Sequence, residues 1–282
     1  MKALQFDRTG DLAALIVTEI ADPVPAADEV LVEVHAAGLN PSDVKNVLGR
    51  FPYTTLPRVP GRDFAGTVVQ GPAELLGKSV WGTGRGLGFS RNGSHAQLMS
   101  VPAGGVALMP ERLSFAQAAS CGVPFTTAWD ALERSQVGNA TRLLVIGSGA
   151  VGAAAISLAK ARGAQVLGAV RRAESQVELQ AQGVPSILLG SAETLAAQVE
   201  EHFPGGAEVI FDTTGFWLPA AVSALATFGR IAIIAAPVDG HVQLPALALY
   251  RRGGSGVGGN SLLYDTLACA AMLRQFGQWK CR

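Results

Sequence analysis

The stretch LLVIGSGAVGAAAISLAKARGAQVLGAVRR, residues 143–172, decides the fold. Apolar residues lead into a glycine-rich segment with the spacing G-x-G-x-x-G, made of Gly147, Ser148, Gly149, Ala150, Val151 and Gly152. An alanine-rich segment and a second apolar run follow. A strand, a glycine turn, a helix and a second strand within about 30 residues are typical of a βαβ unit that binds a dinucleotide.

Each glycine of this segment has a physical role. Gly147 permits a tight turn, Gly149 lets the backbone approach a pyrophosphate, and Gly152 lets the helix pack closely on the strand. The helix, predicted to begin at about Ala150, presents free N–H groups and a partial positive charge to the phosphates. A glycine-rich turn without a ligand is the alternative, and the strand and helix on either side weigh against it.

The end of the second strand indicates which dinucleotide binds. An Asp or Glu there binds the ribose hydroxyls of NAD, whereas a cation accommodates the 2′-phosphate of NADP. Here Arg171 and Arg172 follow the strand, and the first acid is Glu174. The arginines favour NADP(H), and Arg171 is the nearer to the strand. The alternative, that both are solvated residues at the start of a helix, stays open.

Alternating strands and helices are predicted along the rest of this half of the chain. The apolar runs do not alternate with polar residues, which indicates strands buried on both faces of a parallel, doubly wound sheet. The predicted strands are 142–147, 165–170, 186–189, 207–212 and 230–236, and the predicted helices are 150–163, 172–183, 192–203 and 218–229.

The first third of the chain is different. Residues 29–38 alternate strictly, with three valines on one face, as in a half-buried strand. Further short strands are cut by Gly and Pro, which is typical of a small β domain. From Ser114, a residue type that caps helices, the pattern changes to two short helices. We therefore predict an α/β protein with a β-rich domain over 1–116 and a parallel-sheet domain over 117–262.

Composition narrows the function classes. The 282 residues have a formal net charge of +0, so bulk electrostatics favour neither nucleic acid nor a membrane surface. The three cysteines form no C-x-x-C pair, which suits a reducing compartment. The longest apolar stretches are far shorter than the ~20 residues of a membrane helix. We expect a soluble, cytoplasmic protein.

Three further segments carry a family resemblance: AGLNPSDVKNVLGRFP (37–52), VPGRDFAGTVVQ (59–70) and PFTTAWDAL (124–132). Together with the glycine loop, they resemble the zinc-free, quinone oxidoreductase-like branch of the medium-chain dehydrogenase/reductase superfamily. The resemblance implies a GroES-like first domain, a Rossmann second domain and a homodimer. It also implies that residues 263–282 return to the first domain, with a helix over 262–276. Relatives continue past this point, so we expect the first domain to lack a strand.

The metal question follows from this resemblance. Zinc-dependent relatives carry a Cys where this chain has residues 40–43, a Gly-His-Glu segment where it has Gly61-Arg62-Asp63, and a Cys at position 121. Cys121 alone cannot form a tetrahedral site, so we predict no metal. Cys121 is then expected to be a small buried residue, and His35 and His95 to have structural roles.

Without zinc, nothing strong polarises an ordinary ketone. A conjugated acceptor can take a hydride directly, if the protein orients it and excludes water. We therefore predict an NADPH-dependent, zinc-independent reductase of a quinone or another small conjugated carbonyl or alkene. A non-catalytic NADPH-binding structural or regulatory protein, an enoyl-thioester reductase and a zinc-free alcohol dehydrogenase-like enzyme are the alternatives.

The matched motifs also imply residue roles. Asn40, Asp43 and Tyr53 are the catalytic candidates, for contacts with nicotinamide or substrate. Asp43 as a helix cap and Tyr53 as a packed loop aromatic are the alternatives, and Asp63 is expected to be a structural anchor. Besides the glycine loop and the two arginines, the cofactor side is expected to include Thr127, Thr213, Thr214, Gly215, Ala235, Ala236, Pro237 and Asn260.

Overall fold

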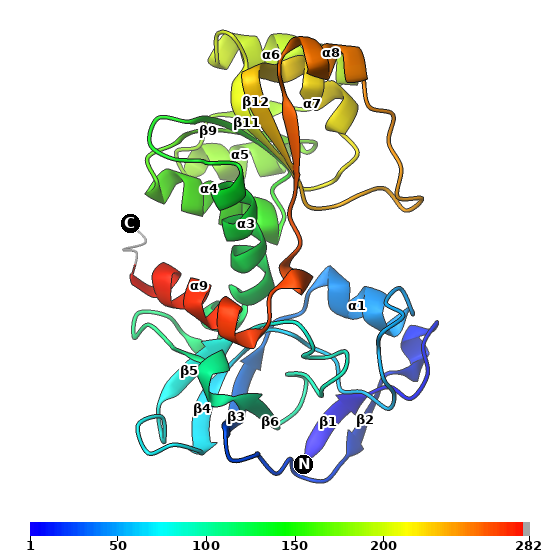
Figure 1. The fold of residues 1–282 in the computed structure, drawn as a ribbon, viewed down its shortest axis with the longest axis vertical. Helices are drawn as coiled ribbons and strands as arrows, with labels where there is room; N and C mark the ends of the chain where they lie inside the picture. Colours follow the sequence, from blue (N-terminus) through cyan, green and yellow to red (C-terminus); the bar gives the residue numbers. More distant parts are fainter. Residues whose placement is uncertain (279–282) are drawn as a thin grey trace. The chain divides into compact units, whose positions relative to one another are not determined.

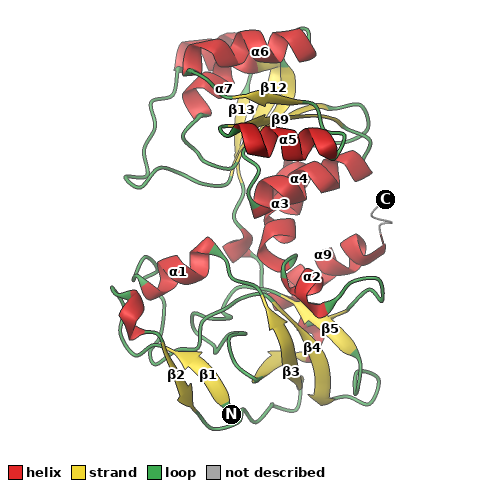
Figure 2. Cartoon of the chain, turned by 180° about the vertical axis from the view of Figure 1, so that it is seen from behind, coloured by secondary structure: helices red, strands yellow, loops and turns green. Residues whose placement is uncertain are grey.

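The structure is a computed structural model that describes residues 1–278, and the chain divides into two units. Of the described residues, unit 1 contains Met1–Thr126 and residues 261–278, and unit 2 contains Thr127–Asn260. The separate sheets of the two units are visible in Figures 1 and 2. No helix among the described residues is long and apolar enough to cross a membrane.

Unit 2 is built on a six-stranded parallel sheet with the strand order β10-β9-β8-β11-β12-β13. This is the doubly wound order of a Rossmann fold, and the order reverses between β8 and β11. The loops that follow β8 and β11 are therefore neighbours at the carboxyl edge of the sheet. The strands are β8 (Arg142–Ile146), β9 (Gln165–Val170), β10 (Ser186–Leu188), β11 (Ala207–Asp212), β12 (Leu225–Ile233) and β13 (Ser255–Gly258).

Helices cover both faces of this sheet. Leu144 and Ile146 of β8 form a core cluster with residues of α6 and α7. Leu143 and Val145 are equally buried and point to the opposite face, where α4 packs on β8 and β9. The helices are α3 (Gly122–Arg134), α4 (Ala150–Ala161), α5 (Ala173–Ala181), α6 (Leu195–His202), α7 (Leu218–Ala224) and α8 (Ala246–Arg251), with a 3₁₀ turn η3 (Ala192–Thr194).

Unit 1 contains an antiparallel five-stranded sheet, β6-β3-β4-β5-β7, and a two-stranded ribbon, β1-β2. Val30 and Val32 of β3 pack with Phe64 and Val68 of β4 in its core. Helix α9 contacts β5, β6 and β7. The strands are β1 (Lys2–Gln5), β2 (Ile16–Glu19), β3 (Glu29–Ala37), β4 (Phe64–Gln70), β5 (Ser79–Gly82), β6 (Leu98–Pro102) and β7 (Ala107–Leu108). The helices are α1 (Pro41–Val47), α2 (Phe115–Ala119) and α9 (Thr266–Gln278), with 3₁₀ turns η1 (Leu12–Ala14), η2 (Ala103–Gly105) and η4 (Ser261–Leu263).

The predicted fold class, a GroES-like β domain and a Rossmann domain, is confirmed. The strand predicted over 29–38 is β3, and the helix predicted from Ala150 is α4. Ser114 does cap α2, because its hydroxyl accepts the Gln117 N–H. Of the segment expected to return to the first domain, residues 279–282 lie outside the described part of the chain.

The strand predicted over 230–236 is β12, Leu225–Ile233, so both of its predicted ends are wrong. Two predicted helix boundaries are also wrong. The helix predicted over 218–229 ends at Ala224, because Leu225 already pairs with Ala207 of β11 and is fully buried in the sheet. The helix predicted over 262–276 begins at Thr266. Its start is fixed by Asp265, whose carboxylate accepts the Ala268 N–H, and the preceding residues form η4.

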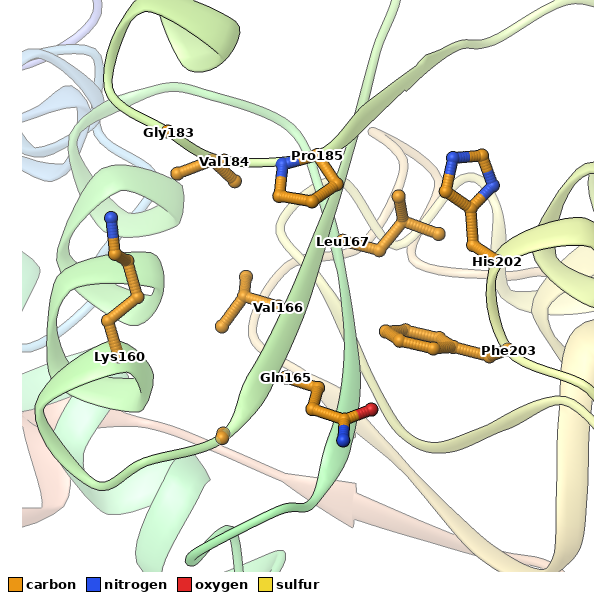
Figure 3. A pocket seen from close by; sticks show the side chains of 10 residues that line it. Lys160, Gln165, Val166, Leu167, Gly183, Val184, Pro185, His202 and Phe203 are labelled. Atoms are coloured by element: carbon orange, nitrogen blue, oxygen red, sulfur yellow. The ribbon is translucent and has the colours of Figure 1, made fainter.

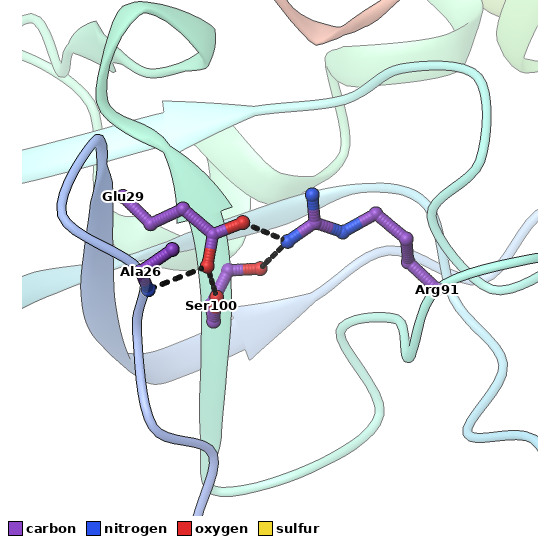
Figure 4. Close-up of polar contacts among 4 residues, drawn as sticks. All are labelled: Ala26, Glu29, Arg91 and Ser100. Atoms are coloured by element: carbon purple, nitrogen blue, oxygen red, sulfur yellow. Dashed lines mark hydrogen bonds and ion pairs between the residues drawn. The ribbon is translucent and has the colours of Figure 1, made fainter.

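A half-buried carboxylate fixes the start of β3. Glu29 accepts hydrogen bonds from Arg91 Nη2, from Ser100 Oγ and, at 3.1 Å, from Ala26 N (Figure 4). Burial alone would raise the pKa of Glu29, but the bonds from Ser100, Arg91 and Ala26 outweigh it and lower the pKa to about 2. The side chain therefore joins β3, β6 and two loops in its ionised form.

We predict that Glu29→Gln lowers the free energy of unfolding by about 2 kcal/mol at neutral pH. The folded pKa lies below the ordinary 4.5, so Glu29 stabilises the fold above pH 4.5 and loses this effect as the pH falls towards 2. Urea unfolding at several pH values measures the difference. Glu19→Gln, at an exposed position of β2, is the control, and an equal loss in both variants would contradict the prediction.

Candidate functional site

The loop after β8 passes very close to the loop after β11. Gly147 has φ +101°, a left-handed conformation that favours glycine. A Cβ at Gly147 would lie 2.2 Å from Thr213 Oγ1. That hydroxyl donates to the Ile146 carbonyl at 2.7 Å, which holds the two loops together. Glycine is thus required at position 147 for both conformation and space.

The other two glycines set how α4 begins. A Cβ at Gly152 would lie 2.1 Å from the Gly147 carbonyl oxygen, so the helix can approach the loop only without a side chain there. Gly149 is the N-cap of α4 and supplies no side-chain cap, and a Cβ on it would meet open space. The first-turn N–H groups of α4 therefore face an opening, as an anion site requires.

This opening is a cavity of about 560 Å³, within the size range of small-molecule sites. It lies at the carboxyl ends of β8, β9 and β11, where open α/β sheets bind ligands. It brings together seven of the predicted cofactor residues with six others. Its lining is Ile146, Gly147, Ser148, Gly149, Ala169, Val170, Arg171, Arg172, Ser175, Leu189, Thr213, Thr214 and Trp217.

The remaining predicted cofactor residues lie elsewhere in unit 2. Ala150, Val151 and Gly152 form the first turn of α4, and Thr127 is a buried residue of α3. Gly215 touches the loop after β12, because a Cβ on it would lie 2.1 Å from the Ala235 carbonyl oxygen. Ala235, Ala236 and Pro237 follow β12 directly, and Asn260 follows β13 by two residues.

Sequence reasoning missed three side chains of this cavity, Ser175, Leu189 and Trp217. Arg172 Nη2 donates to Ser175 Oγ at 3.3 Å, so the serine belongs to the same polar corner as the arginines. The sequence could have identified Ser175 as a cavity residue, because it lies in the first turn of the helix that follows β9. Trp217 and Leu189 follow the ends of β11 and β10, but their residue types suggested only packing.

A second cavity, of about 390 Å³, lies at the amino end of β9 (Figure 3). Val166, Leu167 and Phe203 form apolar walls, and Lys160 Nζ at the rim donates to the Gln182 carbonyl at 3.0 Å. Because ligands of open α/β sheets bind at the carboxyl ends, this cavity is not the dinucleotide site.

In unit 1, Asn40, Asp43 and Asp63 form a buried polar network. The Asn40 N–H donates to Asp43 Oδ2 at 2.8 Å, and the Asn40 side-chain amide donates to Asp63 Oδ2 at 2.9 Å. Asp63 also accepts the Val123 N–H, with N–O distances of 2.9 and 2.8 Å to its two oxygens. Asp63 thus anchors the turn before α1 and the start of α3.

The surroundings of this network raise the pKa values of its two acids, Asp43 and Asp63. Asp43 closes a capping box on α1, as the capping alternative predicted. Burial raises the pKa of Asp43 to about 6. The hydrogen bond from the Asn40 N–H opposes this increase, and the nearby Asp63 charge adds to it. Burial also raises the pKa of Asp63. Two carboxyls close together in an apolar core resist simultaneous ionisation.

Tyr53 lies apart from this network in an aromatic cluster. Its ring centroid is 5.8 Å from that of Phe51 and 5.5 Å from that of Phe89. The side chain is about half exposed, so the ring packs on its neighbours while its edge reaches solvent. Partial burial raises the pKa of its hydroxyl, which is therefore a neutral hydrogen-bond donor at physiological pH.

The sequence-based prediction of no metal concerns residues 40–43, Gly61-Arg62-Asp63 and Cys121. Residues 1–278 contain no cluster of three His, Cys, Asp or Glu side chains able to hold a metal. Cys121 is partly exposed, which corrects the prediction that it is buried, because its Sγ reaches the Gln117 carbonyl at the end of α2. His35 contacts Thr67 Oγ1 at 2.9 Å, and His95 contacts the Gly38 carbonyl at 3.2 Å.

Comparisons with known proteins agree with this architecture. Residues 26–111 match the alcohol dehydrogenase GroES-like domain family, and residues 150–273 match the family described as zinc-binding dehydrogenase. A zinc-type alcohol dehydrogenase-like protein of Schizosaccharomyces pombe is 36% identical over 89% of this chain and 76% of its own length. An NADPH-dependent alkenal/one oxidoreductase of Arabidopsis thaliana is 31% identical over 84% of this chain and 63% of its own.

Among solved structures, the quinone oxidoreductase of Thermus thermophilus, which has also been solved in complex with NADPH, superposes with a TM-score of 0.81. It is 27% identical, and the match covers 98% of this chain and 85% of that one. The chain therefore belongs to the medium-chain dehydrogenase/reductase superfamily of oxidoreductases, in its quinone oxidoreductase-like branch.

We predict that Asp43→Asn removes a pH-dependent loss of stability. The folded pKa of about 6 lies above the ordinary 3.8, so the contribution of Asp43 is present below pH 3.8 and is lost as the pH rises through 6. Urea unfolding across this range should show that the free energy of unfolding of the wild type falls by about 2 kcal/mol relative to that of the variant. Asp28→Asn, an exposed acid of unit 1, is the control. A wild-type to variant difference independent of pH would refute the prediction.

Proposed function

We propose that the protein is a zinc-independent reductase that uses NADPH to reduce a quinone or another small conjugated carbonyl or alkene. The observation that carries the proposal is the cavity at the carboxyl edge of the unit 2 sheet, where the glycine loop and two arginines meet. The relatives support it, since one is named an NADPH-dependent alkenal/one oxidoreductase and another is a quinone oxidoreductase solved with NADPH.

The residues around the cavity fit NADPH. The uncapped first turn of α4 and the open side of Gly149 would receive the pyrophosphate. Arg171, Arg172 and Ser175 would receive the 2′-phosphate, because guanidinium groups bind phosphate through paired hydrogen bonds. Bound there, NADPH would supply the hydride. The protein supplies binding, orientation and exclusion of water.

Unit 1 contributes the residues proposed to orient the acceptor. Asn40 is fixed by its hydrogen bonds to Asp43 and to Asp63, so the turn before α1 is held in place. Tyr53 keeps a protonated, partly exposed hydroxyl that can donate a hydrogen bond to an acceptor oxygen. A conjugated acceptor needs no stronger electrophile, since its own π-system spreads the developing charge.

The proposal includes a homodimer and a cytoplasmic location. Strand β13 forms one edge of the unit 2 sheet and is largely exposed, so it can pair with a partner strand. Cys269 is a buried thiol, which suits a reducing compartment.

The activity itself is tested by mixing the protein with NADPH and either a small quinone or an α,β-unsaturated ketone. We expect loss of nicotinamide absorbance in proportion to the acceptor reduced, and no effect of a zinc chelator on the rate. Tight NADPH binding without turnover of either acceptor would refute the reductase and favour a non-catalytic NADPH-binding protein.

We predict that Arg171→Ala with Arg172→Ala weakens NADPH binding about hundredfold, because two charge-assisted bonds to phosphate are lost. NADH lacks the 2′-phosphate, so its affinity should change by no more than about twofold. Fluorescence titration measures both dissociation constants, and the single variants show which arginine matters more. Arg251→Ala, an exposed arginine of α8, is the matched control. Equal losses for NADPH and NADH would exclude a phosphate role.

A further inference from the structure

Strand β10 covers only part of the edge of β9. Their pairing joins Ser186 to Gly168 and Leu188 to Val170, whereas β8 pairs with β9 from Gln165 onward. In the described part of the chain, residues 165–167 of β9 therefore have a partner strand on one side only. Their uncovered side lies at the second cavity of unit 2, whose lining includes residues 164–167 and 183–185.

A proline explains why the pairing stops there. Within this pair of strands, the Leu189 N–H donates to the Val170 carbonyl at 2.7 Å, and the Gly168 N–H donates to the Pro185 carbonyl at 2.9 Å. Continued in the same register, the next bond would run from the N–H of residue 185 to the Val166 carbonyl. Proline has no N–H, so this bond cannot form.

Val166 consequently has peptide groups that bond no other described residue on the uncovered side. The Gln165 N–H donates to the Thr141 carbonyl on the β8 side, and successive residues of a strand direct their peptide groups to alternate sides. The N–H and carbonyl of Val166 therefore face the cavity. Val166 is only 8% exposed, and an unpaired peptide group at a largely buried position is costly.

The walls around this peptide group are apolar. Val166, Leu167, Val184 and Phe203 are each at most 8% exposed, and Figure 3 shows their side chains around the cavity together with Pro185. The volume of about 390 Å³ is within the size range of small-molecule sites. The Phe203 ring offers a surface on which a second aromatic ring packs favourably.

The charges at the cavity favour a neutral ligand. Helices α4, α5 and α6 end beside it, at Ala161, Ala181 and His202, and the carboxyl ends of helices carry a partial negative charge that disfavours an anion. Lys160 Nζ, which donates to the Gln182 carbonyl, disfavours a second cation. None of the described residues that line the cavity is acidic.

We propose that this cavity is a binding site for a small neutral phenol. The ring packs between the apolar walls, and the hydroxyl donates to the Val166 carbonyl, so the ligand supplies the donor that Pro185 lacks. The cavity shares no lining residue with the cavity at the glycine loop. The site is thus separate from the proposed dinucleotide site, and the inference does not depend on the proposed function.

Titration of the full, isotopically labelled chain with p-cresol, followed by nuclear magnetic resonance, tests the site. We expect a dissociation constant on the order of 1 mM, with the largest amide shifts at residues 164–168 and 183–186. The methyl ether of p-cresol has the same ring but no hydroxyl proton, so it should bind about tenfold more weakly. Saturating NADPH should leave the affinity for p-cresol unchanged.

A variant at the proline tests the role of the unpaired carbonyl. In Pro185→Ala the new N–H can pair with the Val166 carbonyl, so p-cresol should bind about tenfold more weakly and lose its advantage over the methyl ether. Pro245→Ala, at the residue before α8, is the matched control and should bind p-cresol as the wild type does. The comparison of the two ligands in the wild type decides the proposal even if Pro185→Ala does not fold.

Three outcomes overturn the proposal. They are equal affinities of the wild type for p-cresol and its methyl ether, unchanged p-cresol binding in folded Pro185→Ala, and amide shifts centred on the glycine loop with competition by NADPH. If the wild type binds no NADPH, the proposed function fails, while the two ligands still decide whether the second cavity binds a phenol.

Discussion

The contact between Gly147 and Thr213 is the constraint on which unit 2 depends. It lies where the strand order reverses, so two backbones leave neighbouring parallel strands at the same edge. Thr213 is held next to Gly147, because its hydroxyl donates to the Ile146 carbonyl. The Asp212 carboxylate fixes the turn that follows, because it accepts hydrogen bonds from the Thr214 N–H and hydroxyl. The first turn of α4 is consequently held facing the cavity, and the arginines after β9 line the same cavity.

In unit 1, the carboxylate of Asp63 likewise holds several chain segments together. It accepts bonds from the Asn40 side chain and the Val123 backbone, so one carboxylate joins the turn before α1, the start of β4 and the start of α3. This hydrogen-bond network is sensitive to the ionisation of its acids, because Asp43 and Asp63 are both buried and both have raised pKa values. Arg62 supplies the nearby positive charge, and its direct bonds go to Ser261.

The sequence predicted the parts of the fold that local patterns determine. The alternation of residues 29–38 indicated β3, and the glycine spacing placed the loop after β8, because both depend on neighbouring residues. It failed at the end of α7, where Leu225 has helix-compatible neighbours but is taken into β12 by pairing with β11. The Asn40–Asp63 bond and the Arg62–Ser261 contact join residues 23 and 199 positions apart, and no local pattern encodes them.

The polar groups of unit 1 support the proposal that the reaction proceeds without zinc. Around Asn40 this chain has an amide, two acids and a guanidinium that mainly bond one another or the backbone. A divalent cation would place a like charge beside the buried Arg62, which is costly. The protein groups instead balance their own charge and hold the surrounding backbone rigid. In the proposed reaction the acceptor would spread its developing negative charge through its own conjugation, which is the property that quinones and unsaturated carbonyls share.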